Sequence, residues 1–188
     1  SAIGLGHIKD ILNGKQSVPG VELQELDRWG MVSALIGFND PDADKMLDTQ
    51  KKRDPSGDAQ EYLYEVEAGR PEAETKRRYF DEYLHNNSRP EDWIEGSLGA
   101  FNFWNQSQLT EPYLKPALEA LPQIKQERKI FFALAWLNAF IGGQHSPEAQ
   151  KVVYDYLATA HIDPDLRLKI LQVVDELDRT VKIRAKYQ

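Results

Sequence analysis

Proline, in most cases followed by an acidic residue, divides this sequence into short units. Proline is favoured at the first helical position, because the N–H group that it lacks has no intrahelical partner there. An Asp or Ser just before it can cap the helix, and acids in the first turn meet the positive end of the helix dipole. We therefore predict helix starts at six sites: Asp40-Pro41, Asp54-Pro55, Arg70-Pro71-Glu72, Arg89-Pro90-Glu91, Ser146-Pro147-Glu148 and Asp163-Pro164-Asp165.

The residues that follow these prolines have the period of an α-helix. After Pro147, apolar residues recur at a spacing of three to four, and the segment after Pro164 repeats this pattern and ends in basic residues. Basic side chains suit a helix C-terminus. No stretch combines sustained alternation with an enrichment in β-branched residues, so no strands are predicted. The sequence predicts an all-α fold of about eight to ten helices.

The segment Ile130 to Ile141, IFFALAWLNAFI, is apolar on every side and is followed by Gly142-Gly143. Such a helix is typical of the centre of a bundle, and glycine commonly ends a helix. Short helices around one buried helix predict antiparallel helix pairs stacked as a curved, HEAT/armadillo-like helical repeat, or solenoid. We expect residues 1–188 to form a single domain.

Three prolines interrupt the helical pattern of SQLTEPYLKPALEALPQIKQERKIFF, which covers Ser107 to Phe132. They are Pro112, Pro116 and Pro122. A proline inside a helix costs about 3 kcal/mol or more. We therefore expect several short, angled helices here in place of one long one, which would let a wall of helices curve.

Few residues in the chain suit catalysis or metal binding. With no cysteine, disulfides and thiolate metal sites are excluded, and the four histidines are too far apart for a His-Glu-x-x-His motif. We expect no catalytic residue, metal or cofactor site in this chain. The acidic run Asp40 to Asp44 lacks the spacing of a calcium loop and is read as a helix start. The short basic runs Lys51–Arg53 and Lys76–Arg78 are read as solvated helix faces.

The net charge and the hydropathy of the chain argue against two classes of partner, nucleic acids and membranes. The net charge of −7 argues against binding to nucleic acid. The most apolar run has 12 residues, against about 20 for a bilayer span, so no membrane partner is expected. The chain begins at Ser1 without an initiator methionine, and we expect it to be part of a longer, cytoplasmic protein.

The stretch FNFWNQSQ joins aromatic residues to amides at a predicted helix end. One interpretation is aromatic core packing followed by a polar turn. The other is a wall of amides, with Asn102, Gln106 and Gln108 facing the backbone of a bound peptide.

Five motifs, in order along nearly the whole chain, resemble the C-terminal helical domain of the aminopeptidase N family of zinc metallopeptidases, the gluzincins. No single motif is specific, but their order is. They are NGKQSVPGVELQELDRWGMVSAL, RDPSGDAQ, EAGRPEAETKRRYF, QSQLTEPYLKPALEALPQIKQERKIFF and the tail DELDRTVKIRAKYQ. The chain departs from the family at Thr110, where a leucine is usual, at Lys125, where a tryptophan is usual, and at Pro116 to Leu118, where the family has an aromatic stretch. The catalytic motifs of the family are absent from the chain.

The resemblance implies a non-catalytic accessory domain of a zinc aminopeptidase. In that family, the domain covers the zinc-containing catalytic domain, its partner in cis, and encloses a chamber that peptide substrates enter. The resemblance makes Tyr113, Glu127 and Arg128 further candidates for lining the chamber. Arg128 either meets a peptide carboxylate or forms a structural ion pair between helices. The alternative function is a free-standing helical-repeat scaffold that binds a protein partner.

Overall fold

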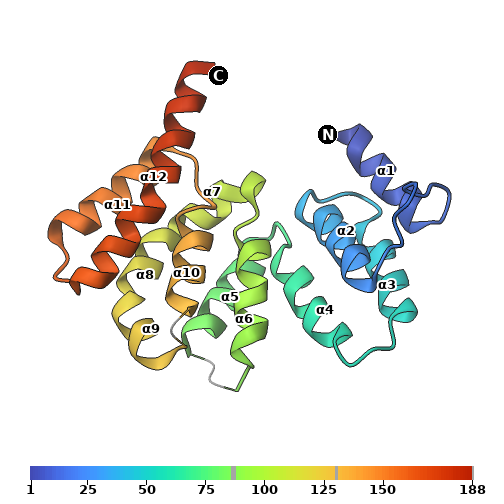
Figure 1. The fold of residues 1–188 in the computed structure, drawn as a ribbon, viewed down its shortest axis with the longest axis horizontal. Helices are drawn as coiled ribbons and strands as arrows, with labels where there is room; N and C mark the ends of the chain where they lie inside the picture. The colour runs from blue at the N-terminus through green and yellow to red at the C-terminus, as the bar shows by residue number, and fades with distance from the viewer. Residues whose placement is uncertain (86–87, 130, 188) are drawn as a thin grey trace.

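The computed structural model describes residues 1–85, 88–129 and 131–187, and these residues are predominantly helical, with no strand among them (Figure 1). The first half contains α1 (Ala2–Leu12), α2 (Glu25–Gly37), α3 (Ala43–Arg53), α4 (Ala59–Ala68), α5 (Ala73–His85) and α6 (Glu91–Phe101). The second half contains α7 (Ser107–Thr110), α8 (Leu114–Glu119), α9 (Leu121–Glu127), α10 (Phe132–Phe140), α11 (Pro147–Thr159) and α12 (Pro164–Tyr187). The all-α prediction is confirmed.

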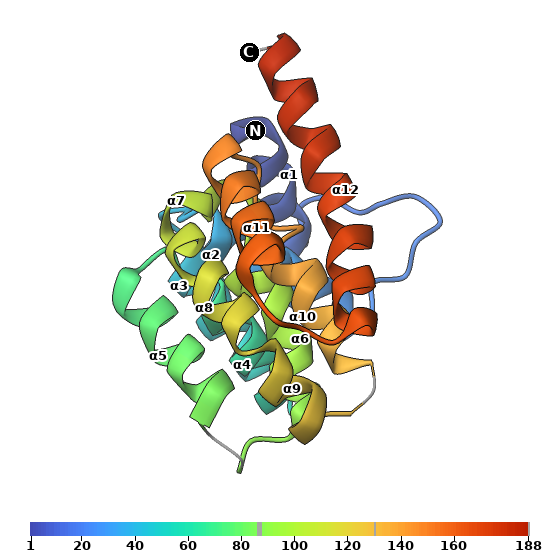
Figure 2. The ribbon, with the colours of Figure 1, turned by 90° about the vertical axis from the view of Figure 1, so that its left-hand side faces the viewer.

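Alternate helices form one continuous layer: α2 packs on α4, α4 on α6, α6 on α10, and α10 on α12. Helices α3, α5, α8 and α11 each pack against a member of this layer, and α8 and α11 also contact each other (Figures 1 and 2). This alternation agrees with stacked helix pairs. The comparison with HEAT or armadillo repeats stays a prediction, because these contacts define neighbours and not a repeating unit.

Two hydrophobic clusters lie between the helices. The smaller one joins α1 to α4 around Trp29, and the larger one extends from α4 to α12 around Trp136. Helix α4 contributes to both, with Tyr64 in the larger cluster and Val66 in the smaller. The two faces of α4 therefore connect the N-terminal helices to the rest of the molecule.

Five of the six predicted prolines lie at a helix start or within two residues before it, and the sixth is displaced further. Pro147 and Pro164 are the first residues of α11 and α12, and Pro90 immediately precedes α6. Pro55 instead lies in a turn, and α4 begins four residues later at Ala59. The carboxylate of Asp54 accepts hydrogen bonds from the indole Nε1 of Trp29 at 2.7 Å and from the Ser56 amide at 2.9 Å, and so ties this turn to the core.

The segment with three prolines is divided into short pieces, as expected. Two 3-10 turns, Trp104–Gln106 and Glu111–Tyr113, alternate with α7 and α8, and α9 follows. Pro112 and Pro122 occupy the first turn of their elements, where a missing N–H group costs nothing.

Helix α10 is central but shorter than the predicted Ile130 to Ile141 segment, whose first residue lies outside the described residues. Phe132, Trp136 and Phe140 are almost completely buried. Phe131, just before the helix, is 76% exposed, and Asn138 is also exposed. The helix therefore has one solvent edge, and the prediction of burial on every side is wrong.

Lys76 corrects another prediction, since it lies in the interior and not on a solvated face. The side chain has no exposed surface, and its Nζ donates to the carbonyls of Ala68 and Phe101, each at 2.8 Å. These carbonyls belong to the last residues of α4 and α6, the negative ends of two helix dipoles. The other basic run, Lys51–Arg53, is exposed as predicted.

Candidate functional site

Two of the predicted site residues brace helix ends. The Gln106 amide donates to the carbonyls of Gly37 and Gly69, at 2.7 and 2.8 Å, and so joins the C-terminal ends of α2 and α4. The Asn102 amide donates to the Leu98 carbonyl at 3.1 Å. Both side chains are buried, at 5% and 4% exposure, so their amides face the chain's own backbone and form no exposed wall.

Three other candidates lie apart from one another. Gln108 is exposed and lines a shallow hollow beside Pro112 and Val152. Tyr113 is half-buried, and its ring packs at 4.9 Å from Phe80. Glu127 is exposed and accepts a hydrogen bond from Gln123 at 3.0 Å. The structure therefore does not gather the predicted chamber residues into one cavity.

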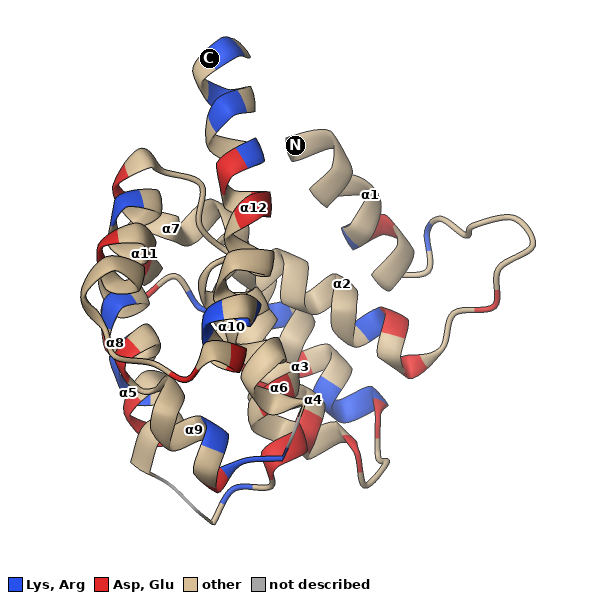
Figure 3. Cartoon of the chain, turned by 60° about the vertical axis from the view of Figure 1, so that its left-hand side comes forward, with Lys and Arg blue, Asp and Glu red and all other residues tan. Residues whose placement is uncertain are grey.

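The sixth candidate, Arg128, lies in a cavity of about 410 Å³ at the start of α12. We call this cavity the basic cleft, and its lining residues are Lys125, Arg128, Lys129, Ala133, Asp165, Leu166 and Lys169. Basic residues at the end of α9 and just after it contribute to the cleft (Figure 3). Four of its seven lining residues are cationic, which favours an anionic group inside it.

Most of these cations already have a carboxylate partner. Lys125 pairs with Asp163 at 3.1 Å, Lys129 with Asp92 at 2.9 Å, and Lys169 with Asp165 at 2.7 Å. The hydrogen bond with Asp163 raises the pKa of Lys125, and that with Asp92 raises the pKa of Lys129. Lys125 and Lys129 therefore stay charged at neutral pH, and the carboxylate partners largely compensate the charge of all three lysines.

Arg128 differs from its neighbours. Its Nη2 donates to the Tyr83 carbonyl near the end of α5 at 2.9 Å, and the guanidinium lies 5.4 Å from the Phe132 ring. Within the described parts of the chain, no ion pair to Arg128 is found. The guanidinium has more donors than this one carbonyl uses, so it is the group in the cleft best able to receive a new carboxylate.

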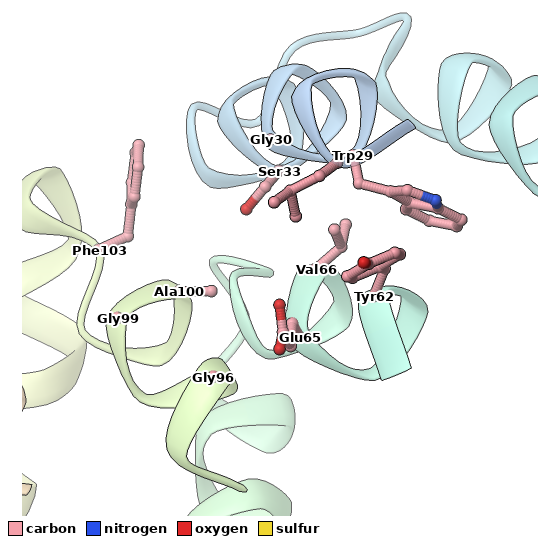
Figure 4. Close-up of a pocket in the computed structure, with 11 residues that line it drawn as sticks. Trp29, Gly30, Ser33, Tyr62, Glu65, Val66, Gly96, Gly99, Ala100 and Phe103 are labelled. Atoms are coloured by element: carbon pink, nitrogen blue, oxygen red, sulfur yellow. The ribbon is translucent and has the colours of Figure 1, made fainter. Parts of the chain in front are cut away.

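A second cavity, of about 310 Å³, lies where α2, α4 and α6 meet (Figure 4). We call it the glutamate pocket, because Glu65 places its carboxylate among apolar and small residues: Leu26, Trp29, Gly30, Ser33, Tyr62, Val66, Gly96, Gly99, Ala100 and Phe103. Gly96 makes room for the acid, since a Cβ built there would lie 1.9 Å from Oε1 of Glu65. Sequence reasoning missed this pocket.

Burial raises the pKa of the Glu65 carboxyl to about 7, with a smaller contribution from the negative charge of Glu61. This carboxyl therefore takes up a proton on folding between its ordinary pKa of 4.5 and about 7. Ionisation of the half-buried Glu65 carboxyl therefore lowers the free energy of unfolding, and this loss grows as the pH rises through that window.

Glu65→Gln is expected to raise the melting temperature by a few degrees at pH 8 and to change it little at pH 5. The amide has nearly the same shape and cannot ionise, so it removes the penalty only where the carboxylate would be charged. Thermal unfolding at both pH values measures the difference. Glu74→Gln, at an exposed site on α5, is the control and should show no such pH dependence. A Glu65→Gln variant that loses stability at pH 8 would contradict the assignment.

The histidines and acids show no metal site: among the described residues, no group of three or more His, Cys, Asp or Glu side chains could hold an ion. The expectation that this chain holds no cofactor stays a prediction. His145 shares a hydrogen bond of 2.9 Å with the Ser107 hydroxyl, which ties α7 to the loop before α11. No described helix is long and apolar enough to cross a membrane.

The fold and the two cavities define an all-helical protein of packed, alternating helices, with one cation-lined and one acid-containing site. Comparison with known proteins adds no family to this description. No protein-family model matches the chain, and no curated protein is significantly similar to it.

Proposed function

We propose that this chain is a non-catalytic C-terminal domain of a zinc aminopeptidase, an enzyme that hydrolyses N-terminal residues from peptides. The observation that carries the proposal is the order of the five motifs along nearly the whole chain. The helical architecture is compatible with it, because a layer of alternating helices can form the wall of a chamber.

In this proposal the domain acts on access and binding, while zinc and the catalytic carboxylate belong to the catalytic domain in cis. The basic cleft supplies the contact with the peptide. Arg128 has unused guanidinium donors there, and a free C-terminal carboxylate is the planar anion that such a group binds best. The hydrogen bond to Tyr83 would hold the guanidinium in place for this contact.

Arg128→Gln in the whole enzyme tests this role. It is expected to raise KM for peptides with a free C-terminus by the equivalent of about 1–3 kcal/mol, the range for a hydrogen bond to a charged group. Steady-state kinetics should show no change for C-amidated peptides or for a small aminoacyl substrate without a carboxylate. Arg77→Gln, at an exposed site on α5, is the control. If both substrate types suffer equally, Arg128 only braces α5 and does not bind the peptide.

A free-standing scaffold is the second candidate, and the end of α12 favours it. This helix extends beyond the rest of the molecule (Figures 1 and 2), and Ile183 and Tyr187 on it are 59% and 74% exposed. Apolar side chains in that position suit a protein partner. The complete reading frame separates the two functions: a zinc-binding domain encoded upstream supports the aminopeptidase, and a frame without one supports the scaffold.

A further inference from the structure

The carboxylate of Glu65 in the glutamate pocket has no counter-charge. Among the described residues, neither an ion pair nor a hydrogen bond to this carboxylate is found, although its side chain is half-buried. Its neighbour on the same helix, Glu67, is by contrast bound by Arg70 at 2.5 Å. A half-buried acid without a partner carries an electrostatic cost that a cationic ligand would relieve.

The walls of the pocket suit an organic cation. Figure 4 shows the Glu65 carboxylate on the pocket side of α4, near the ring of Tyr62, with Ser33 above it on α2. Trp29 and Phe103 also line the cavity, but Trp29 is only 2% exposed, so the Tyr62 ring is the aromatic face beside the carboxylate. Aromatic faces attract ammonium and guanidinium groups, and they also cover the methylene groups that carry them.

The surface around the pocket is acidic as well. Glu95 and Asp92, of which Asp92 pairs with Lys129, lie before Gly96 on α6 and line a neighbouring hollow that includes Gly96. Glu61 lies one turn before Glu65 on α4 and is close enough to influence its charge. No Lys, Arg or His is among the described residues that line the pocket itself. The local field therefore favours the approach of a positive group.

We propose that the glutamate pocket binds the basic side chain of a peptide, with Glu65 accepting hydrogen bonds from its ammonium or guanidinium group. A single carboxylate with the Ser33 and Tyr62 hydroxyls supplies too few oxygen ligands for a metal ion. A cavity of about 310 Å³ is at the lower end of the range for ligand pockets, which suits one side chain more than a whole peptide. Gly96 leaves the carboxylate the space that it needs to face such a ligand. The inference goes beyond the proposed aminopeptidase function and does not depend on it.

The test is a nuclear magnetic resonance titration of the whole chain at pH 8 with blocked tripeptides, which have an acetylated N-terminus and an amidated C-terminus. Ala-Lys-Ala and Ala-Arg-Ala supply the cation, and the same peptide with norleucine keeps the methylene groups without it. The backbone amides of Gly96 and Gly99 report binding at the pocket, because both residues line it. We expect the norleucine peptide to bind about tenfold more weakly than the lysine peptide.

Two variants separate Glu65 from the general acidity of α4. Glu65→Gln keeps the shape of the side chain and should weaken binding of the lysine peptide about tenfold. Glu61→Gln removes the same charge one turn away and should change the affinity by less than about twofold. Gly96→Ala should also weaken binding of the lysine peptide, because the added methyl group would displace the Glu65 carboxylate without removing it.

The dependence on pH gives an independent readout. Affinity should fall about tenfold between pH 8 and pH 6 as the Glu65 carboxyl takes up a proton, and this fall should be absent in Glu65→Gln. Tyr62, the other titratable group in the lining, has a pKa raised above 10 by burial and stays neutral throughout. Glu61 on α4, and Asp92 and Glu95 on α6, are the remaining acids nearby, and Glu61→Gln controls for the closest of them.

Each result decides the matter. Selective, Glu65-dependent binding with shifts at Gly96 and Gly99 supports the proposal, and a preference for one of the two cationic peptides identifies the side chain. Equal binding of the norleucine peptide, or binding unaffected by Glu65→Gln, overturns it. The absence of any chemical-shift change at millimolar peptide also overturns the proposal. So would self-association of the chain through this face, if the peptides do not reverse it.

Discussion

Replacement of Trp136 by alanine should lower the free energy of unfolding by about 3–5 kcal/mol, the largest loss expected from a single truncation in this core. The indole is 1% exposed and lies in the larger hydrophobic cluster. Its ring centroid is 4.3 Å from that of Phe140 and 6.0 Å from that of Phe132, so alanine would leave a cavity between aromatic neighbours.

A hydrogen bond adds to this loss. The indole Nε1 of Trp136 donates to the carbonyl of Ala117 at 3.0 Å and so ties α10 to α8 across the core. Urea denaturation measures the effect as a lower midpoint with an unchanged slope. Phe131→Ala is the matched control, since that aromatic side chain lies five residues earlier but is 76% exposed, and it should change stability by less than about 0.5 kcal/mol. Equal effects at both positions would show that α10 is not the centre of the fold.

Sequence patterns predicted the helices well where the signal is local. Proline with a capping Ser at position 146 or a carboxylate at position 163 defines the start of α11 and α12 within the first turn itself. The pattern failed at Pro55, where Asp54 accepts from the Ser56 amide as Asp163 does from Asp165, but is also bound by Trp29, 25 residues earlier in the chain. A local motif cannot reveal that its carboxylate also ties the segment to a distant part of the core.

Helical periodicity could not predict the two cavities either, because their linings combine residues that are far apart in the sequence. Glu65 lies in AQEYLYEVEA, where its acid resembles Glu61 and Glu67, and nothing in that segment marks it as half-buried. Its environment depends on Gly96, 31 positions later, and on α2. Arg128 was a candidate because of a resemblance between motifs, and the structure adds its hydrogen bond to Tyr83 and the basic cleft around it.

The buried lysine is the residue whose role was least visible in the sequence. Lys76 stands in KRR, beside Arg77, whose side chain is 76% exposed, and only the convergence of α4 and α6 encloses it. Burial lowers the pKa of its ammonium to about 7. Both carbonyl contacts survive loss of the proton, because a neutral amine still has two N–H donors for the carbonyls of Ala68 and Phe101.

Lys76→Met should therefore lower the free energy of unfolding by about 2–4 kcal/mol, because it leaves two buried helix-end carbonyls without their donor. An apolar side chain does avoid the cost of burying an ammonium, but the lysine also avoids it when it is neutral. Arg77→Met is the control and should change stability by about 0.5 kcal/mol or less.

The loss on Lys76→Met should grow as the pH rises from 7 to 9. The pKa of Lys76 is 10.5 in the unfolded chain and about 7 in the folded one, so the unfolded chain binds more protons in this range. The wild-type protein therefore gains stability with rising pH from this group, and the methionine variant does not. Denaturant unfolding of both proteins at pH 7 and pH 9 measures the two differences. A methionine variant as stable as the wild type at both pH values would mean that the carbonyls of Ala68 and Phe101 find other donors, and that Lys76 does not hold α4 and α6 together.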